Sequence, residues 1–162
     1  MHEPDVLDWQ IIKLLMQDGR ISSADISRQL GDVSARTVTN RIEILTEEGI
    51  INIRSIINPD KIGYCVLADV FIEVEPGNLR DVANQLGEYP QISYIALATG
   101  DTDIIISVRA KEIDELYNFV IETIGMIPGV RHTKTFPLPL NIKDLTSWLP
   151  PEVNNPTDND PA

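Results

Sequence analysis

The segment ISSADISRQLGDVSARTVTNRIEILTEEG, residues 21–49, decides the first half of the fold, because two short helical patterns there flank a tight polar turn. Ser22 to Asp25 fit a capping box, in which a serine oxygen accepts a backbone N–H and the acidic side chain reaches back. Gly31-Asp32 interrupts the first helix, and Ser34 can cap a second helix that ends at Gly49. Because the turn is short, the two helices must cross, and the segment predicts a helix-turn-helix.

The second of these helices has an apolar face and a polar face. Val38, Ile42 and Leu45 recur at i, i+4 and i+7, which at about 100° per residue places them on one inward-facing stripe. The opposite face includes side chains that can make bidentate hydrogen bonds to guanine or adenine edges, and its members are Arg36, Thr37, Asn40 and Glu43. A solvated helix surface explains the same residues equally well. The helix by itself therefore leaves both interpretations open.

Several short motifs follow one another in a fixed order within this unit and on either side of it. They are Leu7-Asp8, Asp18-Gly19-Arg20, Ser34, Thr37-Val38, Arg41-Ile42, Glu48-Gly49-Ile50-Ile51, Asn58-Pro59, Gly63, Thr99-Gly100-Asp101-Thr102-Asp103, Pro128-Gly129-Val130, Thr133 and Thr135. In their order and spacing, over roughly Val6 to Lys143, the chain resembles the Lrp/AsnC family, the "feast/famine" transcription regulators. The sequence departs from the family pattern in a longer turn at Gly31 to Ser34, and in Thr102, where an aromatic residue is common.

The resemblance implies that double-stranded DNA is the partner of the second helix. We expect base contacts from Arg36, Thr37 and Asn40 and phosphate contacts from Thr39 and Arg41, with Ser34 at the start of the same surface. The chain carries a net charge of -12, which opposes binding to phosphate. Residues 1–57 account for only -3 of it (six basic against nine acidic side chains), and Ser34 to Ile42 hold two arginines and no acid. We therefore expect weak non-specific affinity and a need for several bound heads.

The chain after Ile57 has the pattern of a second domain. Residues 1–57 form the helix-turn-helix domain, with a short wing or linker strand over Ile50 to Ile57; residues 58–64 are a hinge, 65–149 the second domain and 150–162 a disordered tail. The second domain alternates apolar strands at 66–74, 92–98, 104–108 and 130–136 with helical patterns from Leu79 and from Ile113 to Ile124. The predicted fold is thus α+β, a winged helix-turn-helix followed by a ferredoxin-like βαββαβ domain with both helices on one face.

The uncovered face of such a sheet is too apolar for water. Phe71-Ile72 and Ile104 to Ile106 place hydrophobic side chains on both sides of the sheet. A second copy is the natural cover, so the sequence predicts a homodimer, and the family resemblance implies further assembly into tetramers or octamers.

The loop Thr99 to Asp103 is the second candidate site. Glycine and aspartate are common turn residues, so a solvated hairpin explains them. The resemblance implies an amino acid or related small metabolite bound between dimers, with backbone N–H groups on its carboxylate and an aspartate on its ammonium group. The expected effector-binding residues are Gly100, Asp101, Thr102, Asp103, Thr133 and Thr135. Thr102, in the place of an aromatic residue, removes a stacking wall.

The remaining residues carry little chemistry. Cys65 is the only cysteine, and His132 has no second ligand at metal-binding spacing, so we predict no metal, no cofactor and no enzymatic activity. The chain shows no secretory signal and no long apolar run, which indicates a cytoplasmic protein. Two alternatives remain: an enzyme like the siroheme decarboxylases, which share this architecture, and a DNA-compacting protein without an effector.

Overall fold

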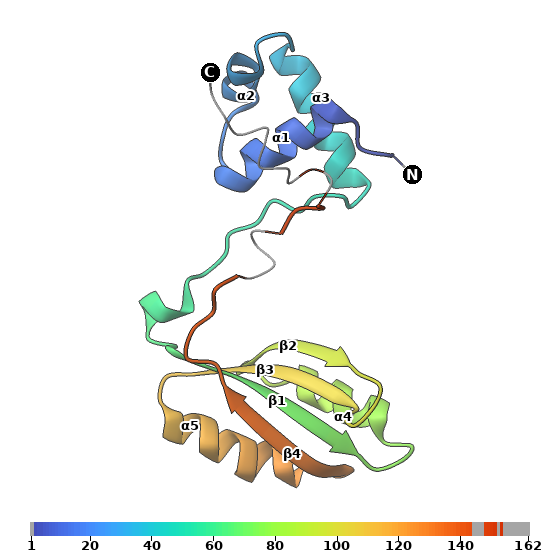
Figure 1. The fold of residues 1–162 in the computed structure, drawn as a ribbon, viewed down its shortest axis with the longest axis vertical. Coiled ribbons are helices and arrows are strands. Elements are labelled where there is room, and N and C mark those ends of the chain that lie inside the picture. Colours follow the sequence, from blue (N-terminus) through green and yellow to red (C-terminus); the bar gives the residue numbers. More distant parts are fainter. Residues whose placement is uncertain (1, 144–147, 152, 154–162) are drawn as a thin grey trace. The chain divides into compact units, whose positions relative to one another are not determined.

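The computed structural model describes residues 2–143, 148–151 and 153. The chain divides into two compact units, the first reaching Ile56 and the second comprising Ile57–Ile142 (Figure 1). Most of the tail predicted for residues 150–162 lies outside the described residues. Among the residues described, no helix has the length and apolar character needed to cross a membrane.

The first unit is built on three helices, α1 (Val6–Gln17), α2 (Ser23–Leu30) and α3 (Ala35–Glu47) (Figure 1). They meet around the side chains of Ile11, Ile26 and Val38, which are completely buried. Helices α2 and α3 are the predicted helix-turn-helix, and Gly31 ends α2 with a φ of 81°, a conformation that glycine adopts without strain. The predicted helix-turn-helix fold is therefore confirmed.

The capping of these helices differs in one detail from the sequence prediction. Ser22 caps α2 by accepting the Asp25 N–H at 3.1 Å, but the Asp25 carboxylate bonds to the Ser22 hydroxyl at 2.5 Å. The reciprocal capping box lies instead at α1, where Asp5 accepts from the Asp8 N–H at 2.9 Å and Asp8 accepts from the Asp5 N–H at 3.1 Å. Two aspartates thus begin α1, and one of them has a further role described below.

The strand predicted over Ile50 to Ile57 does not form in this chain. Residues 51–58 have no regular secondary structure, and Ile53, Ile56 and Ile57 are 49%, 65% and 68% exposed. The alternating pattern is present, but a strand also needs a neighbour to accept and donate its backbone hydrogen bonds. In the described residues, every strand pairing belongs to the second unit. A short 3-10 helix, η1 (Pro59–Ile62), follows the segment.

The second unit is a four-stranded antiparallel sheet in the order β2-β3-β1-β4 (Figure 1). Its strands are β1 (Val66–Val74), β2 (Ile92–Leu97), β3 (Ile104–Ala110) and β4 (Val130–Pro137), and its helices are α4 (Leu79–Gly87) and α5 (Ile113–Asn118). Alternate residues of β1 and β3 are buried in one cluster with Val82, Leu86 and Leu116 of the helices. Both helices therefore cover one face, as the ferredoxin-like prediction requires.

The second helical pattern does not form one continuous α-helix. Helix α5 ends at Asn118 and continues as a π-helical turn, η2 (Phe119–Thr123), and a 3-10 turn, η3 (Ile124–Met126). The wider π turn shifts the apolar stripe, so Phe119 is buried while Ile113 and Tyr117 are 54% and 65% exposed. The predicted helical pattern from Ile113 to Ile124 is therefore broken after Asn118, and the exposed Ile113 and Tyr117 line a cavity on the helix side of the sheet.

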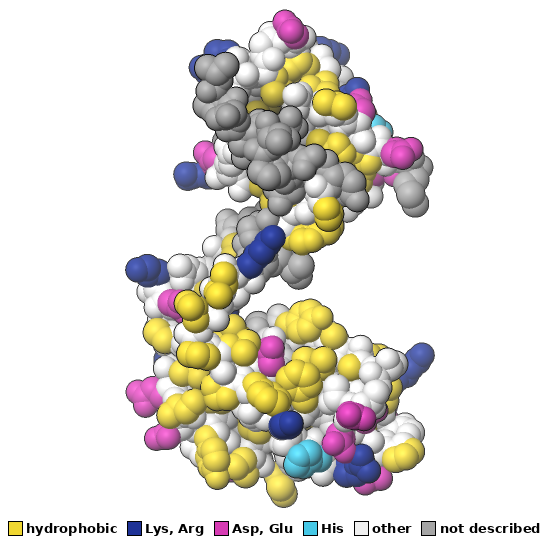
Figure 2. All heavy atoms as spheres, viewed as in Figure 1, with side chains coloured by type: hydrophobic (Ala, Val, Ile, Leu, Met, Phe, Trp, Pro, Cys, Tyr) yellow, Lys and Arg dark blue, Asp and Glu magenta, His cyan; other side chains and the backbone are white. Residues whose placement is uncertain are grey.

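The other face of the sheet is open and largely apolar. The register pairs Phe71 with Ile105, and the rings of Phe71 and Phe136 lie edge to face with centroids 5.2 Å apart. Charged side chains lie among the apolar ones: Asp69 accepts from the Ser107 hydroxyl at 2.6 Å, and the Lys134 ammonium lies 5.1 Å from the Phe136 ring centroid. Figure 2 shows the same mixture on the face of the second unit that it displays.

Candidate DNA-recognition helix and effector cavities

Helix α3 presents the polar face that its sequence predicts. Val38 and Leu45 are completely buried beneath the helix, while Arg36, Thr37 and Asn40 are exposed. The helix begins at Ser34, whose Oγ accepts the Thr37 N–H at 3.1 Å and lies 2.8 Å from the Thr37 hydroxyl. These side chains can reach base edges because they stand on a helix held from the opposite side.

Thr39 lies where α3 meets the beginning of α2. Its hydroxyl oxygen is 2.9 Å from the Ser23 hydroxyl and 3.0 Å from the Ala35 carbonyl oxygen. The residue is exposed, so it is placed at the edge of the surface formed by Arg36 and Asn40.

Arg41 points elsewhere. Its Nη1 lies 2.8 Å from Asp5 Oδ2 and 3.1 Å from Asp8 Oδ2, and its side chain is 28% exposed. Arg41, which the sequence analysis expects to contact phosphate, thus forms an ion pair within the first unit, and its contact with DNA stays a prediction. Both carboxylates belong to the beginning of α1, so this ion pair ties α3 to α1 across the unit.

The ion pair includes a buried carboxylate. Asp8 is completely buried, its Oδ2 also lies 2.7 Å from His2 Nε2, and its Oδ1 has no hydrogen-bond partner among the residues described. Asp5 is half exposed, and its pKa is lowered from 3.8, first by the hydrogen bond from the Asp8 N–H and then by Arg41. A buried anion of this kind persists only when a cation and hydrogen bonds accompany it.

The loop Thr99 to Asp103 forms the predicted β2–β3 hairpin, and its two aspartates differ in their hydrogen bonds and exposure. Gly100 has a φ of 118°, which explains why a glycine stands at this point of the turn. The Asp103 carboxylate accepts the Val74 N–H at 2.8 Å and its own N–H donates to the Ile72 carbonyl at 3.0 Å. Thr102 donates to the same carbonyl at 3.4 Å. Asp103 therefore holds the hairpin to β1, while Asp101 is exposed.

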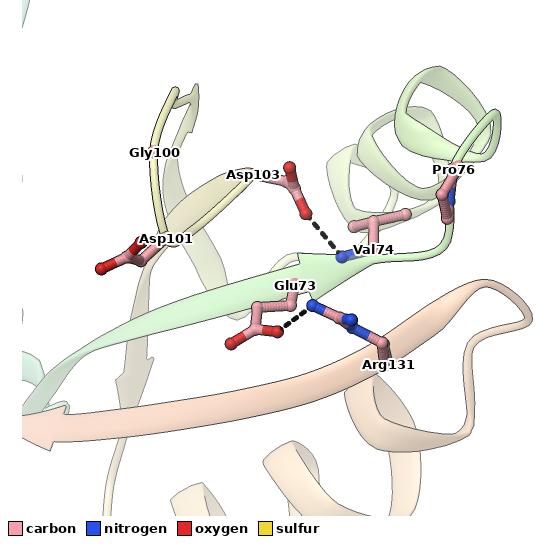
Figure 3. A pocket seen from close by; sticks show the side chains of 7 residues that line it. All are labelled: Glu73, Val74, Pro76, Gly100, Asp101, Asp103 and Arg131. Atoms are coloured by element: carbon pink, nitrogen blue, oxygen red, sulfur yellow. Dashed lines mark hydrogen bonds and ion pairs between the residues drawn. The ribbon is translucent and has the colours of Figure 1, made fainter.

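This hairpin borders an open cavity of about 500 Å³ (Figure 3). Glu73 and Arg131 form an ion pair at its edge, and Figure 3 shows Asp103 pointing to the Val74 nitrogen while Asp101 points away from it. Its lining consists of Glu73, Val74, Pro76, Gly100, Asp101, Asp103 and Arg131. The lining thus includes both kinds of charge that the ammonium and carboxylate groups of an amino acid require, but Glu73 and Arg131 are paired with each other and Asp103 accepts from Val74. We call it the hairpin cavity.

Thr133 and Thr135 lie at a different cavity. The register places them opposite Ile72 and Val70, whose side chains are buried under the helices, so both threonines face the helix side of β4. The cavity there measures about 410 Å³ and is lined by Ile113, Leu116, Tyr117, Val120, Ile121, Thr133, Thr135 and Pro137. We call it the helix-strand cavity. Its lining shares no residue with that of the hairpin cavity, so a single chain does not bring the six predicted effector residues together.

The sequence interpretation missed several residues of these cavities. Glu73 and Arg131 are 58 positions apart and meet only because β1 pairs with β4. Ile113, Tyr117 and Ile121 recur at i, i+4 and i+8, which is a visible signal, but that spacing is also typical of a buried helix face.

An exposed polar helix in a helix-turn-helix, joined to a ferredoxin-like unit with open cavities, defines a DNA-binding regulator with a ligand-binding domain. Residues 4–52 match the winged helix-turn-helix DNA-binding family and residues 67–147 match the Lrp/AsnC ligand binding domain. The chain is 37% identical over 147 residues to the HTH-type transcriptional regulator FL11 of Pyrococcus horikoshii, covering 90% of this chain and 95% of that relative. It is also 33% identical over 134 residues to the regulator LrpA of the same organism, covering 82% and 93%. The chain belongs to the Lrp/AsnC family of transcription regulators.

Solved structures agree on the architecture. AsnC of E. coli superimposes with a TM-score of 0.82 at 27% identity, covering 88% of this chain and 97% of that one. A transcriptional regulator from Neisseria meningitidis, solved as a complex with L-Met, gives a TM-score of 0.83 over 91% and 97% of the two chains, and at 20% identity shows the fold alone. The two family matches and the regulators FL11 and LrpA support transcription regulation and give no support to the decarboxylase alternative.

Proposed function

We propose that this regulator reads DNA through α3 and changes its assembly when an amino acid or related metabolite binds the second unit. One observation carries the DNA-binding part: Arg36, Thr37 and Asn40 are exposed on a helix whose opposite side is buried through Val38 and Leu45. Arg36 and Asn40 contact base edges, and Thr39 and Ser34 contact phosphate at the edge of the same surface. Arg41 positions α3 through Asp5 and Asp8.

The proposal includes a homodimer formed through the open sheet face. Phe71, Ile105 and Leu67 lie on this face, and a second sheet would remove them from water. The chain has an acidic net charge and few cations near α3, so one recognition helix alone would bind DNA weakly. A dimer would bind more tightly because two recognition helices contact the same duplex. Light scattering of the full chain is expected to show at least a dimer at micromolar concentration, and a stable monomer would contradict this part.

The effector part uses both cavities. The hairpin cavity would hold the charged ends of an amino acid, with Asp101 on the ammonium group and Arg131 or backbone N–H groups on the carboxylate. Thr133 and Thr135 would contact the rest of the molecule. Since these groups line separate cavities in one chain, the effector would join cavities from two copies and would favour one assembly over another. The binding of L-Met by the Neisseria relative supports an amino acid as the effector class.

This function requires no catalytic step. The protein would act in the cytoplasm, where its DNA target and its metabolite would both be present. Tetramers or octamers would set the spacing of the recognition helices along the duplex.

The DNA-binding part is tested with duplexes selected from a randomised library by the purified protein. Arg36→Ala and Asn40→Ala are each expected to weaken binding to the selected duplex by about 1–3 kcal/mol and to leave binding to random duplex nearly unchanged. Arg80→Ala, which removes one exposed arginine from α4 of the second unit, is the charge-matched control. If the Arg36→Ala/Asn40→Ala double variant binds the selected duplex as the parent does, the assignment of α3 is wrong.

A further inference from the structure

The helix-strand cavity carries no charge. None of its eight lining side chains is acidic or basic, and its polar side-chain groups are the hydroxyls of Tyr117, Thr133 and Thr135. The hairpin cavity, in contrast, contains Glu73, Asp101, Asp103 and Arg131. The second unit thus offers one charged and one neutral cavity to a ligand.

The size of the helix-strand cavity suits a small molecule. Its volume of about 410 Å³ lies within the range of about 300–1,000 Å³ that is usual for ligand pockets. Thr133 and Thr135 of β4 line one side of this space, and residues of α5 and of the turn after it line the other. Along the helical wall, Tyr117 and Ile121 remain 65% and 48% exposed, so apolar surface is left that a ligand can cover.

We infer that the helix-strand cavity binds the side chain of the effector and that it selects uncharged, apolar side chains. This inference rests on the proposed function, in which the second unit binds an amino acid or a related metabolite. When a second copy encloses the effector, as the proposed function requires, a charged side chain would lose its hydration here without meeting an opposite charge in the lining, whereas an apolar one gains by leaving water. The threonine and tyrosine hydroxyls tolerate a thioether or hydroxyl group but provide no ion pair.

Two pairs of amino acids of matched shape test the inference on the full chain. Leucine and aspartate have similar branched side chains, and norleucine and lysine have similar linear ones, so each pair differs mainly in charge. Isothermal titration calorimetry is expected to show that leucine and norleucine bind at least about 10-fold more tightly than their charged counterparts, as the desolvation of an unpaired charge requires.

Variants of the lining residues test whether this cavity is the source of the selectivity for apolar side chains. Thr135→Asp is expected to weaken the binding of norleucine about 10-fold and to strengthen the binding of lysine about 10-fold, because it supplies the missing carboxylate. Thr135→Val keeps the shape without the charge and is expected to retain the preference for norleucine. Tyr117→Asp makes the same charge change at a 65% exposed position, which keeps the test available if Thr135→Asp does not fold.

The outcomes separate this inference from the proposal beneath it. If lysine or aspartate binds the parent chain as tightly as its apolar counterpart, the inference is overturned and an amino-acid effector stands. If norleucine binds but neither aspartate variant alters its affinity, the side chain binds elsewhere and the inference is again overturned. If no amino acid of the set binds at all, the effector part of the proposed function fails with it.

Discussion

The two units hold their candidate functional groups in different ways. In the first unit the recognition surface belongs to one helix, which is fixed by an apolar stripe and by the ion pair between Arg41 and the buried Asp8. In the second unit the candidate groups lie on a hairpin and on a helix-strand pair, around two cavities with different linings. A single chain therefore presents the residues proposed to bind DNA on one continuous surface, whereas the residues proposed to bind an effector lie in separate places.

The largest expected effect comes from removing the buried carboxylate of the first unit. Asp8→Ala leaves Arg41 with Asp5 alone and empties a fully buried position, so the free energy of unfolding of the first unit is expected to fall by about 3 kcal/mol. Urea denaturation followed by circular dichroism measures this loss. Asp18→Ala, at an aspartate whose side chain is 59% exposed, is the control and is expected to change little. Equal stabilities of the two variants would show that the ion pair does not hold α3.

In the second unit, the hydrogen bond from the Val74 N–H to the Asp103 carboxylate holds the hairpin to β1, as the Asp8–Arg41 ion pair holds α3 to α1. Asp103→Ala removes a charged acceptor from a backbone donor and is expected to cost about 2 kcal/mol. Asp101→Ala, two residues earlier and exposed, is expected to change stability by less than about 0.5 kcal/mol and to weaken the calorimetric binding of an amino acid. The reverse pattern, with Asp101 stabilising the fold, would exchange the roles given to the two aspartates.

A smaller effect tests whether Arg41 positions α3 or contacts phosphate. The double variant Asp8→Leu/Arg41→Met replaces the ion pair with apolar groups and leaves the net charge unchanged. Its free energy of unfolding is expected to lie within about 1 kcal/mol of that of the parent chain. The Asp8 Oδ1 that lacks a partner among the described residues favours this tolerance. The slope of log K against log salt for random duplex is expected to stay the same. A slope smaller in magnitude by about 0.9 for each Arg41 in contact with DNA would indicate a phosphate contact.

The smallest expected effect is a dependence of the stability of the first unit on pH in the acid range. The pKa of Asp5 in the folded chain lies below its usual 3.8, so its contribution to stability is complete above that value and is lost as pH falls through the lower, folded-state pKa. The melting temperature of the first unit is therefore expected to decline below about pH 4, and the decline should be shallower in Asp5→Asn. Identical profiles for Asp5→Asn and the parent would show that Asp5 contributes nothing to this dependence.

Several features could be predicted from the sequence because local periodicity decides them. The stripe of Val38, Ile42 and Leu45 sets which face of α3 is buried, and the alternation in β1 and β3 sets which face of the sheet the helices cover. Gly31 and Gly100 occur where the backbone has a positive φ, so the ends of the turns were also readable.

Other features could not be predicted because they depend on partners distant in the sequence. Arg41 has the sequence position of a phosphate contact, yet Asp8, 33 residues earlier, binds its guanidinium. The π turn after Asn118 exposes Tyr117, which a regular helical period would place in the core. Ile53 and Ile56 alternate as in a strand, but a strand requires a neighbouring backbone, which periodicity does not supply.

The amino-acid sequence by itself determined the three helices of the first unit, the order of strands and helices in the second, the two units and the polar face of α3, because each of these follows from side-chain spacing and capping within a short stretch of chain. Only the tertiary structure decided that Arg41 is paired to Asp8, that Asp103 and Asp101 differ in role, and that Thr133 and Thr135 line a neutral cavity apart from the charged hairpin. Those features depend on which strands and helices become neighbours, and burial and charge pairing are settled only when the elements pack together.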